Sequence, residues 1–231
     1  MQFFDNVLSA ATQVGVLYVI VAIGFICDKT GFFTEKTARA TVNLLLYIVT
    51  PCTLINSFIK IEMNQDTVRK FFISFAVATA THLIAILINK PLFRNKADED
   101  NAVYKFASIY GNVGFMALPL AQAVLGDEGV FYCANGVVIY NIICFTHGVA
   151  LMNKGKEKFN ILKLIFNPGV ISVIIGLPIF LLSIEVPKVL SQPVEMMANL
   201  NTPVAMLIFG TYLANTDLKS MFKKREFIKL L

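Results

Sequence analysis

The chain has 231 residues, of which 56% are hydrophobic and 15% are charged, and its mean hydropathy is +0.68. Because soluble domains carry about 25% charged residues, this composition excludes a soluble enzyme and predicts an integral membrane protein. The formal net charge is +5, but the basic residues lie in short stretches between apolar runs, which favours membrane topology over nucleic-acid binding.

Seven apolar segments are long enough to cross a bilayer as helices, each of which needs about 20 residues. They are residues 7–27, 38–59, 71–93, 104–125, 128–151, 168–184 and 193–214. If the N-terminus lies outside, most of the 20 Lys and Arg residues fall on the inner side. Because an excess of basic residues marks the cytoplasmic side, we predict a multi-pass protein of the cytoplasmic membrane with its N-terminus outside.

The fourth segment contains a stretch that makes a poor membrane helix, Gly111-Asn112-Val113-Gly114-Phe115-Met116-Ala117-Leu118-Pro119. Pro119 removes a backbone donor and clashes with the preceding turn, and the glycines permit backbone conformations that other residues avoid. Broken helix at membrane depth survives only where protein or a watery cavity surrounds it. We therefore predict a discontinuous helix here, of the kind that forms midplane sites in secondary transporters.

Two short matches at the same offset along the chain indicate an internal repeat. Ile23-Gly24-Phe25 in the first segment matches Ile175-Gly176-Leu177 in the sixth, and Thr50-Pro51 in the second matches Thr202-Pro203 in the seventh. The repeating unit would hold five helices, so its second copy would enter the membrane from the opposite side. Copies of the third, fourth and fifth segments are missing, and we expect that the sequence is part of a longer chain.

The chain resembles the auxin efflux carrier family, the bacterial relatives of the plant PIN carriers, along its whole length. The resemblance rests on the fourth-segment stretch and on four shorter matches, which are Thr50-Pro51, Asn135-Gly136, Tyr140-Asn141 and Asn201-Thr202-Pro203. It implies an all-α membrane fold of two inverted five-helix repeats with a broken crossover helix, as in bile-acid symporters and NhaA-type antiporters. About seven of the ten helices would be present.

The resemblance also implies a division into two units. Residues 1–60 and 153–215 would form a scaffold unit that also makes a homodimer interface, and residues 61–152 would form a moving transport unit. Residues 216–231 would hold a cytoplasmic loop and the start of an eighth helix. The implied function is secondary transport of small organic anions, auxin-like or malate-like carboxylates, by alternating access.

Polar residues within the segments are the candidates for substrate contact. Asn112 offers amide donors and an acceptor beside the broken helix, with capping of the break as the alternative role. Thr53 could line the substrate path from the scaffold side, and Asn135 and Asn141 could line it from the fifth segment. Interhelical hydrogen bonding is the alternative for the last two. Gly111, Gly114 and Pro119 are expected to make the break, and Pro51 and Pro203 to kink scaffold helices.

His82 is the candidate for coupling transport to protons, because it is the only ionisable residue deep in the third segment. A neutral histidine bonded to a neighbouring helix is the alternative, and a sodium gradient could replace protons. No Lys or Arg lies in the middle of a segment, so amides and helix dipoles would hold the anion.

Neither a metal nor a cofactor is expected. The four cysteines lie in or beside apolar segments without CxxC spacing, which is typical of small buried hydrophobes: Cys27, Cys52, Cys133 and Cys144. No GxxxxGK[ST] loop for ATP occurs.

Two other functions fit the same pattern of segments. A seven-helix receptor or sensor shares the outside N-terminus, although a retinal-binding version would need a lysine that residues 193–214 lack. An inactive remnant of a transporter is the other alternative. A membrane enzyme is not expected, because the segments lack an HExxH motif and paired carboxylates.

Overall fold

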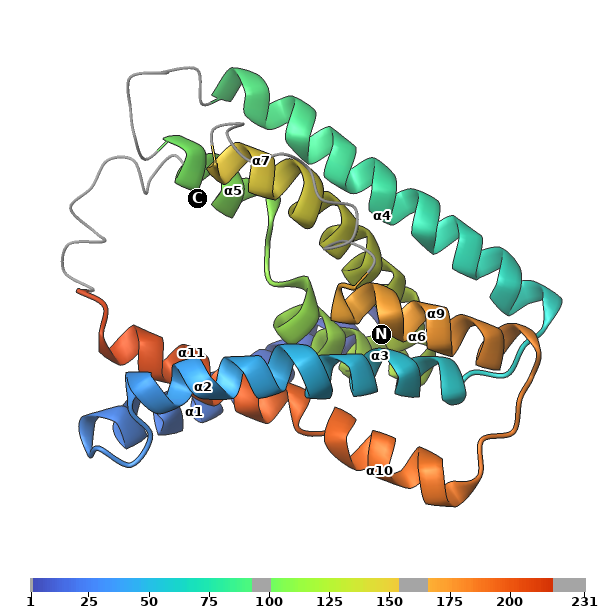
Figure 1. Ribbon diagram of the computed structural model, residues 1–231, viewed down its shortest axis with the longest axis horizontal. Helices are drawn as coiled ribbons and strands as arrows, with labels where there is room; N and C mark the ends of the chain where they lie inside the picture. The colour runs from blue at the N-terminus through green and yellow to red at the C-terminus, as the bar shows by residue number, and fades with distance from the viewer. Residues whose placement is uncertain (1, 93–100, 154–165, 218–231) are drawn as a thin grey trace.

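Every secondary-structure element in the described part of the chain is a helix. The structure, a computed structural model, describes residues 2–92, 101–153 and 166–217. The helices, shown in Figure 1, are α1 (Gln2–Lys29), α2 (Glu35–Leu44), α3 (Thr50–Ile59), α4 (Gln65–Leu92), α5 (Asn101–Ile109), α6 (Leu118–Ile143), α7 (Val149–Met152), α9 (Pro168–Leu181), α10 (Lys188–Ala198) and α11 (Asn201–Ala214). Three π-helical turns join neighbouring helices: η1 (Leu45–Val49), η2 (Val113–Ala117) and η3 (Cys144–Gly148).

Four stretches are long and apolar enough to cross a membrane, which confirms the all-α membrane fold. They are Phe4–Lys29, Glu35–Ile59, Gln65–Leu92 and the 52-residue stretch Asn101–Met152. The last one turns back at Gly126, whose φ of 66° lies in the left-handed region that glycine adopts without strain. It therefore contains the fourth and fifth segments, with the boundary where the sequence placed it.

The sixth and seventh segments differ from the prediction. The sixth is α9, whose 14 residues span about 21 Å at 1.5 Å per residue and so fall short of a full crossing. The seventh is not one helix but two, α10 and α11, separated at Asn199 and Leu200. The predicted eighth helix and most of the basic inner loops lie outside the described residues.

Proline is accommodated by a π-turn in two places. Pro51 follows η1 and Pro119 follows η2, each as the second residue of the next α-helix. A π-turn shifts the backbone pairing that proline disrupts, so the chain stays helical through both positions. Pro51 therefore sits in a helix that continues from Glu35 to Ile59, and Pro203 lies in the first turn of α11.

Close helix pairs form through glycine. Gly24 of α1 lies against the backbone of Leu207 in α11, and Gly210 of α11 lies against the backbone at Val21. Gly176 of α9 packs on the ring of Phe58 in α3. The first segment thus pairs with the seventh, and the sixth pairs with the second. These two pairs correspond to each other if the sixth segment repeats the first and the seventh repeats the second. The repeat itself stays a prediction.

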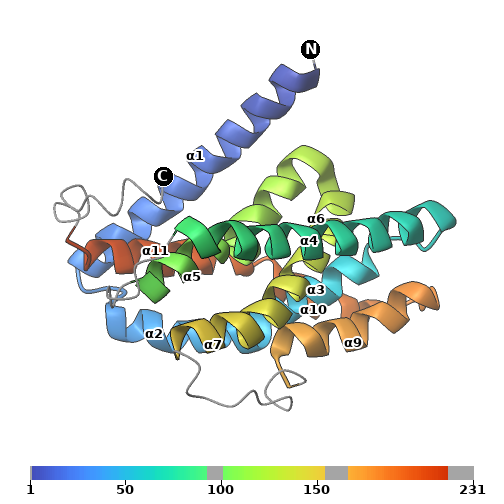
Figure 2. The same ribbon diagram turned by 90° about the horizontal axis from the view of Figure 1, so that it is seen from above.

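The helices pack into one bundle from which α1 projects. Figure 2 shows the N-terminal half of α1 leaving the other helices at an angle. Apolar side chains on this half are exposed, among them Phe4 and Leu8, as is typical of a surface that faces hydrocarbon. The C-terminal half contributes Leu17 and Val21 to a core shared with α2 and α11.

An aromatic cluster joins four helices on one side of the bundle. Phe58 of α3, Phe71 of α4, Phe131 of α6 and Phe180 of α9 are all buried. The Phe131 and Phe180 ring centroids lie 4.9 Å apart, and Phe58 meets Phe131 edge-on at 5.5 Å. This cluster is the largest aromatic contact between the predicted scaffold and transport units.

Candidate functional site

The break in the fourth segment lies between α5 and η2, at residues 110–112. The Asn112 side chain caps η2, because its Oδ1 accepts from the backbone N–H of Phe115 at 3.0 Å. The capping role is therefore observed. The Asn112 amide nitrogen makes no hydrogen bond with a described residue, so both of its donors remain available.

The break is shorter than the sequence suggested, and its glycines act differently. Neither Gly111 nor Gly114 has a positive φ, and a Cβ at either would meet no described atom within 4 Å. Pro119 lies beyond the break, inside α6. The expectation that these three residues make the break is wrong for Pro119, and neither glycine is conformationally required.

A second break faces the first from the seventh segment. Here α10 ends at Ala198 and α11 begins at Asn201, which leaves terminal carbonyl and N–H groups without helical partners. The Thr53 hydroxyl lies 3.4 Å from the carbonyl oxygen of Ala198 and 3.0 Å from that of Val49. Because a hydroxyl has one hydrogen, the shorter bond to Val49 is favoured, and Thr53 contacts the end of α10 more weakly.

Asn201 connects the two breaks. This side chain is only 2% exposed; its Nδ2 donates to the carbonyl oxygen of Gly114 at 3.3 Å, and its Oδ1 accepts from the Thr50 hydroxyl at 3.3 Å. The sequence did not single out Asn201 as a site residue. An Asn-Thr-Pro start is, however, a recognisable helix beginning, with proline in the first turn, and it could have marked the break.

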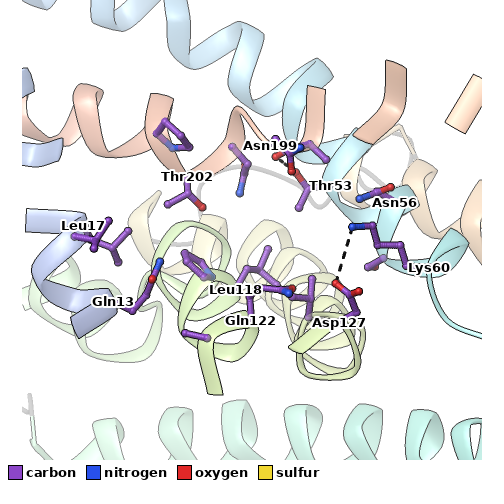
Figure 3. A pocket seen from close by; sticks show the side chains of 18 of the residues that line it. Gln13, Leu17, Thr53, Asn56, Lys60, Leu118, Gln122, Asp127, Asn199 and Thr202 are labelled. Atoms are coloured by element: carbon purple, nitrogen blue, oxygen red, sulfur yellow. Dashed lines mark hydrogen bonds and ion pairs between the residues drawn. The ribbon is translucent and has the colours of Figure 1, made fainter. Parts of the chain in front are cut away.

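A cavity of about 530 Å³ lies beside the second break, between α1, α3, α6, α10 and α11. Its size is that of a small-molecule site. Figure 3 shows polar side chains entering it from these elements, and those with amide or hydroxyl groups are Gln13, Thr53, Asn56, Ser57, Gln122, Asn199, Asn201 and Thr202. Of the predicted site residues, Thr53, Pro119 and Pro203 line the cavity, whereas Gly111, Asn112, Gly114, Asn135 and Asn141 do not.

The charged residues at the cavity lie at one end. Lys60, which directly follows α3, and Asp127 of α6 are the only ionisable residues among its described lining. The Lys60 ammonium lies 2.8 Å from a Glu195 carboxylate oxygen and 4.0 Å from one of Asp127. The hydrogen bond to Glu195 raises the pKa of Lys60 above its usual value, with the nearby carboxylate charges adding to the effect against partial burial.

The polar residues of the fifth segment hold helices together. Asn135, buried in α6, donates through Nδ2 to the Ser74 hydroxyl of α4 at 2.7 Å. Asn141 packs against Gly169 near the start of α9. Interhelical hydrogen bonding is thus the observed contact of Asn135, and substrate contact by Asn135 or Asn141 stays a prediction.

The histidines lie within the predicted transport unit. His82 Nδ1 is 2.8 Å from the carbonyl oxygen of Ala78, so its hydrogen-bond partner lies in its own helix, and its ring meets that of Tyr140 in α6 edge-on with the centroids 6.1 Å apart. His147 is hydrogen-bonded to the Tyr110 hydroxyl at 2.8 Å, and Tyr110 is the first residue of the break. Tyr110 was not singled out from the sequence, and its contact makes His147 the histidine linked directly to the break.

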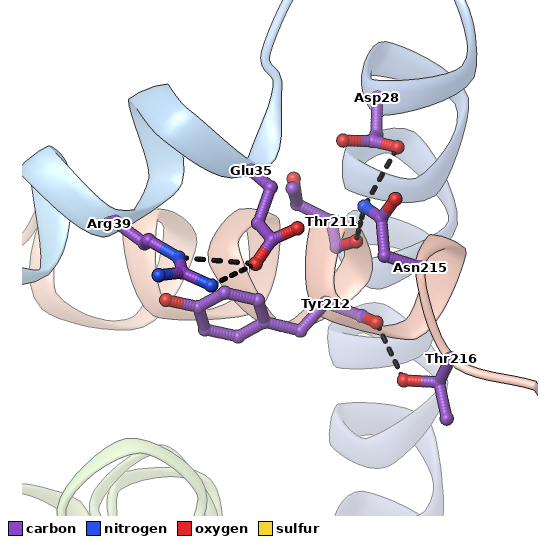
Figure 4. A network of polar contacts seen from close by, with 7 residues as sticks. All are labelled: Asp28, Glu35, Arg39, Thr211, Tyr212, Asn215 and Thr216. Carbon is purple, nitrogen blue, oxygen red and sulfur yellow. Dashed lines mark hydrogen bonds and ion pairs between the residues drawn. The ribbon is translucent and has the colours of Figure 1, made fainter.

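At the opposite end of the bundle, α1 is tied to α11. Figure 4 shows Asn215 donating to Asp28 at 3.0 Å and, beside it, Arg39 paired with Glu35 at 2.6 Å. Lys29 donates to the carbonyl oxygen of Ala214 at 2.8 Å. Charged groups therefore gather at both ends of the helices, and the middle of the cavity is lined by neutral groups. Nowhere in the described ranges do three or more His, Cys, Asp or Glu side chains gather as a metal site.

A sequence model of the family described as "Membrane transport protein" matches residues 9–230. The chain belongs to this family. It is the auxin efflux carrier family that the fourth-segment motif indicated, so the resemblance is confirmed.

Two relatives have names that agree with the family. An uncharacterized transporter of Methanocaldococcus jannaschii is 25% identical over 216 residues, covering 88% of this chain and 69% of its own. A protein of Rhizobium meliloti named "Putative malonate transporter" is 26% identical over 185 residues, covering 76% of this chain and 58% of its own. The chain thus spans about two thirds or less of these relatives, and it is a multi-pass membrane protein of a transporter family.

Proposed function

We propose that the chain carries a small organic anion, a malonate-like, malate-like or auxin-like carboxylate, across the cytoplasmic membrane by alternating access. The cavity beside the break between α10 and α11 is the observation that carries the proposal. It lies where the proposed scaffold and transport units meet, with α1, α3, α10 and α11 on one side and α6 on the other. A ligand at such a boundary is exposed to either side as one unit moves against the other.

The groups around the cavity suit a carboxylate. Its described lining offers several neutral amide and hydroxyl donors and no cation in its middle. Gln13, Asn56, Gln122 and Asn199 make no side-chain hydrogen bond with another described residue, so their donors are free for a ligand. The name of the Rhizobium relative adds malonate to the candidates.

The ends of the helices support the proposed topology. Lys60 at the end of α3, Asp127 of α6 and Glu195 of α10 meet at one end of the bundle. Asp28 and Asn215 meet at the other. These contacts agree with helices that alternate in direction, and the proposal that the N-terminus and the Lys60 end lie outside rests on the distribution of Lys and Arg along the sequence. We further propose, from the resemblance alone, a homodimer through the scaffold helices.

The test is counterflow in liposomes that contain the purified chain. Vesicles loaded with unlabelled malonate should accumulate external labelled malonate transiently above equilibrium, because only a carrier exchanges one substrate molecule for another. Protein-free vesicles are the control. Malate and an auxin-like carboxylate, added outside as competitors, rank the substrates. Specific binding without exchange would favour the receptor alternative, and neither binding nor exchange would favour the inactive remnant.

Proton coupling through His82 is tested separately. Exchange by a His82→Gln variant should lose its response to an imposed pH gradient, while the same variant retains counterflow. A normal response to the gradient contradicts the role of His82. The matched variant His147→Gln shows whether the histidine at the break takes that role instead.

A further inference from the structure

Lys60 is the one basic residue in the described lining of the cavity, which is otherwise mostly neutral. It follows the last residue of α3, its backbone N–H donates to the carbonyl oxygen of Asn56 at 3.1 Å, and its side chain reaches the cavity. Figure 3 shows the ammonium directed across the cavity toward Asp127, with Asn56 and Gln122 nearby. An anion held at this end of the cavity lies near both the Lys60 ammonium and the Asp127 carboxylate.

The two carboxylates beside Lys60 differ in how they are held. Glu195 lies on α10, which packs against α3 within the scaffold unit, and its carboxylate is at hydrogen-bonding distance from the ammonium. Asp127 lies on α6, in the transport unit, and its carboxylate is at 4.0 Å, beyond a direct hydrogen bond. An ammonium has three donors, so the Glu195 bond leaves donors unused on the side of Asp127.

Polar contacts between the units are few among the described residues, in contrast to their apolar packing at the aromatic cluster. Among the described residues, the polar contacts that cross from scaffold to transport unit are Lys60 with Asp127 and Asn201 with Gly114, at 4.0 and 3.3 Å. The Lys60 and Asp127 side chains are 36% and 51% exposed, and ion pairs of such exposure are weak. The Lys60–Asp127 ion pair therefore adds little resistance to a movement of the transport unit, during which Glu195 would stay with Lys60.

We propose that Lys60 is the charge-selective gate of the cavity, exchanging the Asp127 carboxylate for a carboxylate of the entering anion while Glu195 keeps the ammonium at the mouth. The proposal rests on the proposed function and names a residue that selects anions. Because Lys60 donates to Glu195, its pKa lies above the usual value, and the group remains a cation throughout the neutral range. With Asp127 in place, the mouth is closed to anions by a negative charge. With Asp127 withdrawn, an unpaired donor attracts them.

The test measures charge selection without requiring transport. A single cysteine, Gln122→Cys, is placed in the cavity of a variant without the native cysteines, in liposomes. Its modification rates by a negatively and a positively charged thiol reagent of similar size are compared. We expect Lys60→Gln to lower the ratio of anionic to cationic rates, and Asp127→Asn to raise it, each by about fivefold at low salt. Both changes should shrink in about 1 M salt.

Matched variants at the same end of the bundle serve as controls. Lys188→Gln and Asp66→Asn remove one charge of each sign without touching the cavity lining, and both should leave the ratio unchanged. Lys60→Arg should retain the ratio of the parent. An unchanged ratio of anionic to cationic rates in Asp127→Asn, or equal changes in the control variants, overturns the gate. The Asp127→Asn measurement remains a test even if Lys60→Gln does not fold. Absent counterflow with a responsive ratio would instead contradict the proposed function and leave the gate intact.

Discussion

At the scale of single residues, Asn112 combines two roles that the sequence had presented as alternatives. Its oxygen caps η2, and its amide nitrogen is free of described partners. A capping side chain is a common feature of broken helices. The free donors, in contrast, lie outside the lining of the cavity, so their contact with an anion during transport stays a prediction. The residue type and the break were predictable from the sequence, but the division of its two polar atoms was not, because it depends on the backbone path through residues 110–112.

Substitution of Asn112 separates these roles. Asn112→Ser keeps an oxygen that can cap η2 and removes the amide donors, so we expect near-normal thermal stability and at least a tenfold loss of malonate exchange. Asn112→Ala removes both groups, with an additional cost of about 1 kcal/mol in stability. Thermal unfolding in detergent and counterflow are measured on the same preparations. Normal exchange by Asn112→Ser would show that capping alone matters.

Lys60 gives a pH dependence with a defined sign. Its folded-state pKa is raised above the usual 10.5 by the hydrogen bond to Glu195. Its contribution to stability is therefore complete below pH 10.5 and is lost as the pH rises through the folded-state pKa. The difference in melting temperature between the parent and Lys60→Gln should be constant from neutral pH to about pH 9 and shrink above 10.5. A difference that disappears already near pH 8 would contradict this assignment.

At the scale of elements, the close pair α1–α11 depends on glycine. A Cβ at Gly24 would collide with the carbonyl of Leu207, whereas one at Gly15 of the same helix would meet nothing within 4 Å. We expect Gly24→Ala to destabilise the protein by about 1–3 kcal/mol, because the helices must separate. Gly15→Ala should leave the melting temperature unchanged or raise it slightly. Equal effects of the two substitutions would show that helix propensity, not packing, governs this pair.

The helices themselves were largely predictable, and their irregularities were not. Hydropathy placed the segments that became α1, α4 and the α5–α6 stretch, because length and apolar content suffice for that. The break at Asn199 and Leu200 was not predicted, because the hydropathy of a long window is hardly changed by a break of two residues. From Pro119 we predicted a longer break than the structure has. The π-turn before Pro119 accommodates the missing backbone donor, so the helix does not end there. The cavity was not predictable, since it arises from the packing of five helices distant in sequence.

At the scale of the whole molecule, the aromatic cluster packs the two proposed units against each other. Phe131 is fully buried between Phe58 and Phe180, which belong to the scaffold unit. We expect Phe131→Ala to destabilise the protein strongly, since equivalent losses in soluble cores cost about 3–5 kcal/mol. Phe72→Ala, on the exposed face of α4, is the control. Similar melting temperatures for the two variants would contradict a packed boundary at this cluster.

The account requires that the two units move past one another during transport. A cleavable cross-linker between cysteines at Val16 of α1 and Ala123 of α6, which line the cavity from the two units, tests this movement directly in a chain without native cysteines. Counterflow of labelled malonate is measured before linking, after linking and after cleavage. We predict that linking stops exchange and that cleavage restores it, whereas single-cysteine variants treated in the same way continue to exchange. Undiminished exchange by fully cross-linked protein would contradict alternating access between these units.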